Sequence, residues 1–140
     1  MAEPPKTPIH RLRFPGTLAG FEEASRSLRQ FLEAHRLSED TRFHIELVFE
    51  EIAVNIIRHG KPRADVNVEV TVNGEVVLTF EDDGQSFDPR DQPLPAPPES
   101  IEETRVGGLG LVLVKQFCTR LEYERTAEDR NRLTVSIPVR

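Results

Sequence analysis

Apolar and polar residues alternate along five short stretches of the chain, as they do in strands that bury one face. Asn73 and Gly74 separate two of these stretches, and Asn-Gly is the strongest short-range hairpin signal. The pattern therefore predicts five strands, two of which form a hairpin. The predicted strands cover residues 9–14, 64–72, 75–81, 120–126 and 132–139.

Two longer stretches carry apolar residues at the 3.6-residue spacing of amphipathic helices. Thr17 can cap a first helix that runs to about residue 35. Ser38 opens the next one, whose apolar positions recur over residues 41–59 until Gly60 ends it. A third helix is predicted after Gly110, where the apolar run LVLVKQF begins.

The predicted elements follow the order β-α-α-β-β-loop-α-β-β, in which hairpins dominate. This order indicates an α+β fold with two layers: a mixed, mostly antiparallel sheet with helices on one face. We expect a single domain over residues 9–140, preceded by a Pro-rich, disordered segment at 1–8. The Pro-rich loop over residues 82–106 is long for a compact domain, and such loops are usually functional or disordered.

The composition of the chain argues against some classes of binding partner. The chain has 140 residues and a formal charge of −6, which argues against direct nucleic-acid binding. No apolar run approaches the roughly 20 residues that cross a bilayer, and the N-terminus lacks a signal-peptide pattern. The single cysteine, Cys118, fits a reducing compartment. We therefore expect a cytoplasmic protein that contacts neither nucleic acid nor membrane.

The long predicted helix carries Glu51, Asn55 and His59 at a spacing of four residues, which places them on nearly one face. Asn55 is flanked by apolar residues, and its amide oxygen is a natural ligand for magnesium. Glu51, one turn earlier, has the chemistry of a general base. A polar stripe that faces solvent is the alternative interpretation of the same spacing.

Two glycine-bearing segments supply further candidates. Asp82 and Gly84 follow a predicted strand, where a carboxylate can accept a hydrogen bond from an exocyclic amine and the glycine lets a flat ligand approach. An ordinary acidic turn would look the same. Gly107, Gly108 and Gly110 precede the apolar helix, and backbone N–H groups at such a turn suit phosphate. A flexible helix entry is the alternative there.

In this order, the three motifs resemble the boxes of the Bergerat-type (GHKL) ATPases, the superfamily of sensor histidine kinases, type II topoisomerases, heat-shock chaperones and mismatch-repair proteins. Glu51-x-x-x-Asn55-x-x-x-His59 looks like the N-box, and Asp82-x-Gly84-x-x-Phe87 looks like the first glycine box. Gly108-Leu109-Gly110-Leu111 looks like the second. The resemblance spans about residues 9–139 and implies the Bergerat fold, a two-layer α/β sandwich.

The resemblance also implies roles. Glu51 would be the general base, Asn55 would hold Mg²⁺, Asp82 would read the adenine of ATP, and a lid over about 88–106 would close on the phosphates. His59 fits the N-box, but a structural histidine is the preferred interpretation. Arg105 fits a phosphate contact on the lid and a solvated arginine equally well. The further residues that the resemblance places at the ATP site are His59, Gly84, Phe87, Arg105, Gly108, Leu109, Gly110 and Thr134.

Within the superfamily, the chain looks most like bacterial anti-sigma factor serine kinases. Ser86-Phe87-Asp88 stands where other groups have a third glycine, and no dimerisation helix with a phospho-acceptor histidine is attached. The resemblance implies an ATP-dependent serine/threonine-protein kinase that regulates transcription. It would phosphorylate a STAS-type anti-sigma factor antagonist and bind a sigma factor, with a homodimer possible. A non-catalytic ATP-dependent switch, a detached histidine-kinase-type ATPase domain and a protein without nucleotide are the alternatives.

Overall fold

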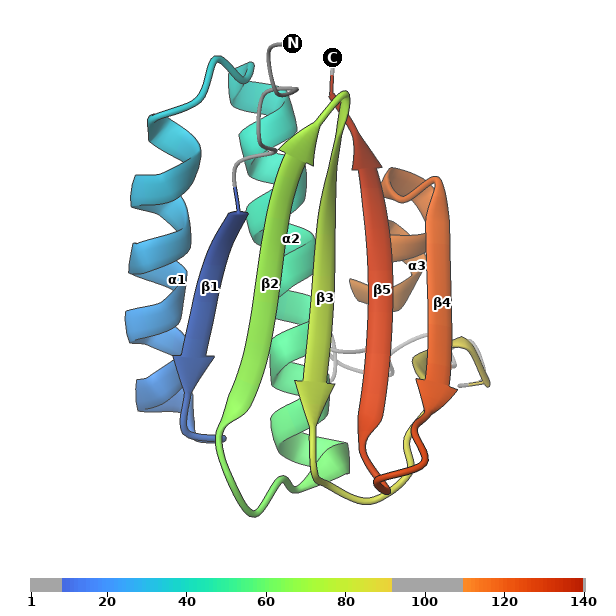
Figure 1. The fold of residues 1–140 in the computed structure, drawn as a ribbon. Helices are drawn as coiled ribbons and strands as arrows, with labels where there is room; N and C mark the ends of the chain where they lie inside the picture. The colour runs from blue at the N-terminus through green and yellow to red at the C-terminus, as the bar shows by residue number, and fades with distance from the viewer. Residues whose placement is uncertain (1–8, 92–109, 140) are drawn as a thin grey trace, which may run out of the picture.

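The computed structural model describes residues 9–91 and 110–139. Its five strands form one sheet in the order β1-β2-β3-β5-β4, and all four pairings are antiparallel. The three α-helices lie together on one face of this sheet (Figure 1). The strands are β1 (Ile9–Phe14), β2 (Val66–Asn73), β3 (Glu75–Asp82), β4 (Arg120–Arg125) and β5 (Asn131–Pro138). The helices are α1 (Leu18–Glu33), α2 (Glu39–Asn55) and α3 (Gly110–Phe117).

The predicted two-layer α+β fold is therefore confirmed. The sheet is simpler than the mixed sheet expected from the sequence, because no parallel pair occurs in the part of the chain that the structure describes. The Asn73–Gly74 hairpin is also confirmed. Pairing continues to Asn73 opposite Glu75, so Gly74 alone lies outside the strands, with a φ of 66° that favours glycine.

The core lies between the helices and the covered face of the sheet. Alternate residues of the central strands are fully buried there, as a pleated strand requires. Phe49 of α2 stacks at 5.8 Å from Phe80 of β3, which joins the two layers. The fully buried aliphatic side chains of the sheet are Val66, Val70, Val76, Leu78, Val135 and Ile137.

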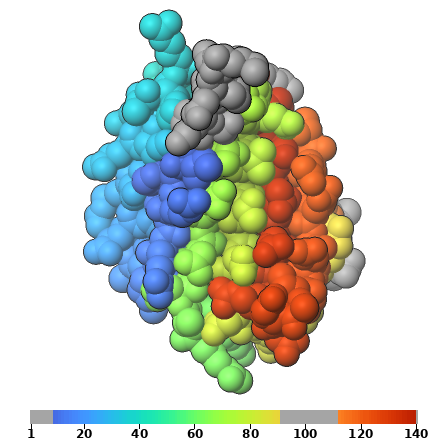
Figure 2. All heavy atoms as spheres, viewed as in Figure 1, coloured from blue at the N-terminus to red at the C-terminus, as the bar shows by residue number. Residues whose placement is uncertain are grey.

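The other face of the sheet is open and polar. Figure 2 shows the side chains of all five strands on this face. Arg132 of β5 pairs with Glu124 of β4 at 2.7 Å and with Glu81 of β3 at 3.5 Å. Exposed ion pairs of this kind contribute little to stability, so they mark a solvated surface rather than a second core.

Candidate functional site

Helix α2 changes its winding where the candidate site begins. After Asn55 the chain continues as a π-helical turn over Ile56–Gly60, which ends at Lys61 in the left-handed region with φ 49°. Turns of this kind are rare and occur frequently at functional sites. The wider turn rotates the residues that follow Asn55 relative to a regular helix.

This turn corrects the expectation that Glu51, Asn55 and His59 share one face. Glu51 and Asn55 are buried, with 4% and 5% of their surfaces exposed, whereas His59 is exposed. The His59 ring instead stacks on Phe87, with ring centroids 4.9 Å apart and planes at 15°. The spacing argument fails at its third residue because it assumed a regular α-helix to the end.

Glu51 and Asn55 each carry a polar atom that is sealed from solvent and unpaired. Neither Glu51 Oε2 nor Asn55 Nδ2 has a hydrogen-bond partner among residues 9–91 and 110–139. Burial raises the pKa of Glu51, nearby Glu50 raises it further, and Arg58 opposes both. A solvent-facing stripe is thereby excluded for these two residues. Unpaired buried polar groups are costly, so a pair of them one turn apart marks a candidate functional site.

Asp82 ends β3 as a buried carboxylate with one oxygen occupied. Its Oδ1 accepts hydrogen bonds from the Gly84 N–H at 2.8 Å and from Asn131 Nδ2 at 3.1 Å. Burial raises the pKa of Asp82, while these two bonds oppose the increase. Its Oδ2 accepts no hydrogen bond from the described residues and remains available as an acceptor.

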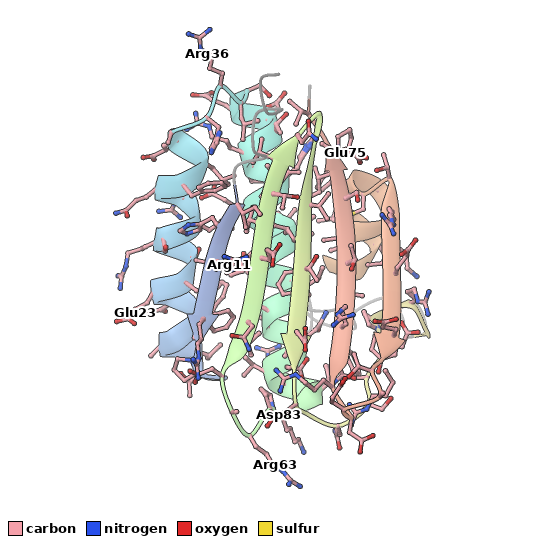
Figure 3. All side chains as sticks on the ribbon, in the orientation of Figure 1. Arg11, Glu23, Arg36, Arg63, Glu75 and Asp83 are labelled. Carbon is pink, nitrogen blue, oxygen red and sulfur yellow. The ribbon has the colours of Figure 1, made fainter. Side chains whose placement is uncertain are left out.

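The segment that follows β3 packs closely against the end of α2. A Cβ atom at Gly84 would lie 2.2 Å from the Gly60 carbonyl oxygen, so no larger residue fits there without a shift. The Gln85 N–H donates to that same oxygen at 2.8 Å. Asp83 Oδ1 accepts from the Arg63 N–H at 2.8 Å, and Figure 3 labels both residues at this end of the molecule. The two segments that carry the candidate residues are thus held together.

Residues of α2, β3 and β5 line a cavity. The adjoining ends of these three elements lie at the lower end of Figure 1. The empty volume of the cavity is about 350 Å³, including the part open to solvent. The enclosed space itself holds only about 20 Å³, but its lining is mostly apolar with a few polar groups, a composition typical of small-molecule sites. Asn55, Asp82 and Asn131 supply its polar side chains. The other lining residues are Ile52, Ile56, Gly60, Phe80, Phe87, Pro89, Tyr123 and Leu133.

The structure brings together only part of the residues chosen from the sequence. Asn55, Asp82 and Phe87 line the cavity, whereas Glu51 lies one helical turn before Asn55 and is not part of the lining. Gly110 begins α3. Arg105, Gly108, Leu109 and most of the predicted lid lie outside the described residues.

Thr134 requires a correction. On β5 it lies between Leu133, which lines the cavity, and buried Val135, so its side chain points to the opposite face of the sheet. Its cross-strand neighbours there are Thr79 and Glu122. Thr134 is therefore not among the residues that line the cavity.

Asn131 is the polar residue of the cavity that the sequence did not reveal. It is buried opposite Asp82 in the β3–β5 register, and its Oδ1 accepts a hydrogen bond from the Tyr123 hydroxyl at 2.5 Å. Its importance depends on the pairing of strands 49 residues apart, for which no local motif exists. An amide at the first residue of a strand is too common to be a signal on its own.

Over residues 9–91 and 110–139, neither a protein-built metal cage nor a membrane span is found. Among the residues described, no three His, Cys, Asp or Glu side chains gather as a metal ion would need. Within the same ranges, no helix combines the length and apolar character that a bilayer crossing requires.

The fold and the cavity define a class: an antiparallel α+β domain with a small-molecule site between a long helix and the sheet. Comparison with known families is specific. The model of the histidine kinase-like ATPase domain matches residues 14–137. The chain belongs to this family.

Individual relatives agree with this assignment. The serine/threonine-protein kinase BtrW of Bordetella bronchiseptica is 31% identical over 105 residues, which cover 72% of this chain and 73% of BtrW. Two solved structures share the fold at low identity. One holds the RsbU and RsbW domains of Rv1364c from Mycobacterium tuberculosis, with a TM-score of 0.67 and 14% identity; the match covers 95% of this chain and 33% of that one. The other is the SiaB-SiaC complex from Pseudomonas aeruginosa, with a TM-score of 0.66, 19% identity, and coverage of 91% and 88%.

Proposed function

We propose that this protein binds Mg–ATP in the cavity and transfers the γ-phosphoryl group to a serine or threonine of a partner protein. The proposed substrate is a STAS-type antagonist of an anti-sigma factor, and the protein itself acts as the anti-sigma factor in the cytoplasm. The observation that carries the proposal is the pair of buried, unpaired polar atoms on Glu51 and Asn55 beside the cavity. The kinase relative BtrW supports the reaction type.

The side chains present fit a nucleotide and its magnesium ion. Asn55 lines the cavity, and neither its Oδ1 nor its Nδ2 makes a hydrogen bond to a described residue, so the amide is free for a ligand. Amide oxygens suit magnesium, which is usually held by one or two protein groups together with phosphates. When bound, the ion neutralises charge on the phosphates.

Asp82 and the apolar walls would hold the base. The free Asp82 Oδ2 can accept a hydrogen bond from the exocyclic amine of adenine. Ile52 and Ile56 provide apolar surface from α2 and its π-helical turn, and Phe80 and Leu133 provide it from the sheet, which excludes water from the base. Gly84 carries no side chain, so the segment after β3 can lie against α2 and close this end of the cavity.

Glu51 would act on the acceptor hydroxyl. As phosphorus forms a bond to the hydroxyl oxygen and releases ADP, Glu51 Oε2 accepts the hydroxyl proton. Burial, which raises the pKa of Glu51, makes its carboxylate a stronger base than an exposed glutamate. The unpaired state of Oε2 fits this role, because no neighbour in the described residues competes for the proton.

The test is a transfer assay with γ-labelled ATP, Mg²⁺ and a purified STAS-domain protein from the same genome. We expect label on the STAS-domain protein and none on its serine-to-alanine variant. No transfer, with ATP binding intact, would contradict the kinase proposal. A Glu51→Ala protein should then lose transfer and keep ATP binding, whereas a purely non-catalytic switch would capture its partner equally well with or without Glu51.

A further inference from the structure

Asn131 is placed so that its amide nitrogen donates to Asp82. It begins β5, lies directly opposite Asp82 in the antiparallel register, and is 5% exposed. Its Nδ2 donates to Asp82 Oδ1 at 3.1 Å and to the Gln85 carbonyl at 2.8 Å. Because the Asn131 side chain is buried and these bonds hold its NH₂ group, the amide has a single orientation.

The two donors on its other side fix which end faces Asp82. Tyr123 donates its hydroxyl proton to Asn131 Oδ1 at 2.5 Å, and Arg125 Nη1 donates to the same oxygen at 3.1 Å. Arg125 Nη1 also donates to the Gly84 carbonyl at 2.8 Å, which ties it to the segment after β3. A flipped amide would put its NH₂ group against these two donors and leave Asp82 without its side-chain donor.

This arrangement leaves Asp82 with a defined chemical character. Oδ1 accepts hydrogen bonds from the Gly84 N–H and from Asn131, whereas Oδ2 accepts none from the described residues and is the oxygen left for a ligand. The Asn131 donor also opposes the effect of burial on the pKa of Asp82, as does Arg130, whereas Asp83 adds to that effect. An ionised carboxylate accepts hydrogen bonds only, but a protonated one can also donate.

We infer that Asn131 is a positioning residue that sets the base selectivity of the site: by holding Oδ1 of Asp82, it presents Oδ2 as an acceptor that fits a purine with an amino group at position 6 and opposes one with a carbonyl there. The inference rests on the proposed nucleotide binding. The resemblance implies only that Asp82 recognises adenine. The inference adds that discrimination between an amine and a carbonyl at position 6 depends on Asn131, which does not itself need to contact the base.

The experiment compares the affinities of ATP and inosine triphosphate, which differ by an amine against a carbonyl at position 6, by calorimetry with Mg²⁺. The wild-type protein should bind ATP at least roughly 100-fold more tightly, because a site built to accept a hydrogen bond rejects a group that cannot donate one. In Asn131→Ala the ratio should fall by roughly tenfold, mainly through weaker ATP binding. In Tyr123→Phe, where Arg125 still holds the amide, it should fall several-fold.

Asn67→Ala is the matched control, since Asn67 is an exposed asparagine of β2 on the open face and should leave the ratio unchanged. A thermal melt of each variant shows that it is folded. An unchanged ratio in folded Asn131→Ala overturns the inference, and if that variant does not fold, an unchanged ratio in Tyr123→Phe does so. Equal affinity of the wild type for both nucleotides would overturn the inference alone, whereas no affinity for either would overturn the proposed function too.

Discussion

Helix α2 begins in a regular, capped turn and ends in a π-helical turn beside two unpaired buried side chains. At its start, Ser38 Oγ accepts a hydrogen bond from the Thr41 N–H at 3.1 Å, and Glu39 and Asp40 lie where the helix dipole favours negative charge. At its end, Glu51 and Asn55 hold polar atoms with no partner among the described residues.

The two ends of α2 therefore differ in role: the start contributes to stability, and the end carries the groups that we propose for function. Each arrangement at the start lowers the free energy of the folded state. The unpaired groups at the end raise it, by about 1–3 kcal/mol for each buried atom without a partner. Such a cost persists where binding or catalysis needs the free group, and the comparison can be tested by changing each end separately.

Glu51→Gln should have the largest effect. We expect the rate of phosphoryl transfer to fall by roughly 10²–10⁴-fold, because the amide cannot accept the hydroxyl proton. ATP affinity should stay within about threefold, since Glu51 does not line the cavity. The measurement is single-turnover transfer at saturating ATP, with Glu50→Gln, an exposed neighbour on the same helix, as control. Equal loss in both variants would contradict a specific role for Glu51.

The same substitution should raise stability at high pH. The pKa of Glu51 is higher in the folded protein, so the folded state binds its proton more tightly and ionisation of Glu51 opposes folding. Glu51→Gln should therefore stabilise the protein by roughly 0.5–2 kcal/mol at pH 8. The gain should vanish near pH 4, where the unfolded carboxyl also becomes protonated. Urea denaturation at the two pH values measures this, and a gain that does not depend on pH would refute the assignment.

Gly84→Ala should damage the junction between the two segments of the site. The new Cβ would lie 2.2 Å from the Gly60 carbonyl oxygen and 2.8 Å from Asp82 Oδ1, so backbone must move. We expect a loss of about 2 kcal/mol in the free energy of unfolding and weaker ATP binding. Gly74→Ala is the control: it has open space around it and a positive φ, so it should cost about 1 kcal/mol and leave ATP affinity unchanged.

Ser38→Ala tests the other end of α2. Loss of the side-chain cap should reduce the free energy of unfolding by about 1 kcal/mol. The affinity for ATP and the transfer rate should not change, because Ser38 lies at the opposite end of the helix from Asn55. Urea denaturation and ATP titration on the same preparation provide the comparison. A loss of affinity with stability unchanged would reverse the roles that we assign to the two ends.

Thr134→Val should have the smallest effect. Because its side chain lies on the open face between Thr79 and Glu122, we expect ATP affinity within about twofold of the wild type. This prediction separates side-chain direction from position along the strand, because Thr134 directly follows Leu133, which lines the cavity. A tenfold loss of affinity would mean that the threonine reaches the ligand and that the strand register differs in the complex.

Local sequence rules predicted the elements well and the site only in part. The strand alternation, the Asn-Gly turn and the Thr17 and Ser38 caps each depend on neighbouring residues, and all are found in the structure. The motif spacing selected Asn55 and Asp82, and both residues line the cavity. It failed for His59 because no local pattern signalled the π-helical turn that moves this residue out.

Residues whose importance comes from long-range pairing were missed. Asn131 meets Asp82 only once β5 has paired with β3, and Tyr123 meets Asn131 only once β4 has paired with β5. Thr134 is turned away by the pleat of β5. Periodicity along the chain gives the two faces of a strand, but not which residue of the next strand lies opposite a given side chain. The register therefore has to come from the structure.

The most direct test of the account is a calorimetric titration of ATP into the wild-type protein and into Asn55→Ala, each with Mg²⁺ and with a chelator. We expect the wild type to bind ATP in a Mg²⁺-dependent way. Asn55→Ala should bind Mg–ATP roughly 100-fold more weakly, yet unfold at the same or a higher temperature because its buried unpaired amide is gone. A wild type that binds no ATP, or an Asn55→Ala protein that binds Mg–ATP as tightly as the wild type, would contradict the account.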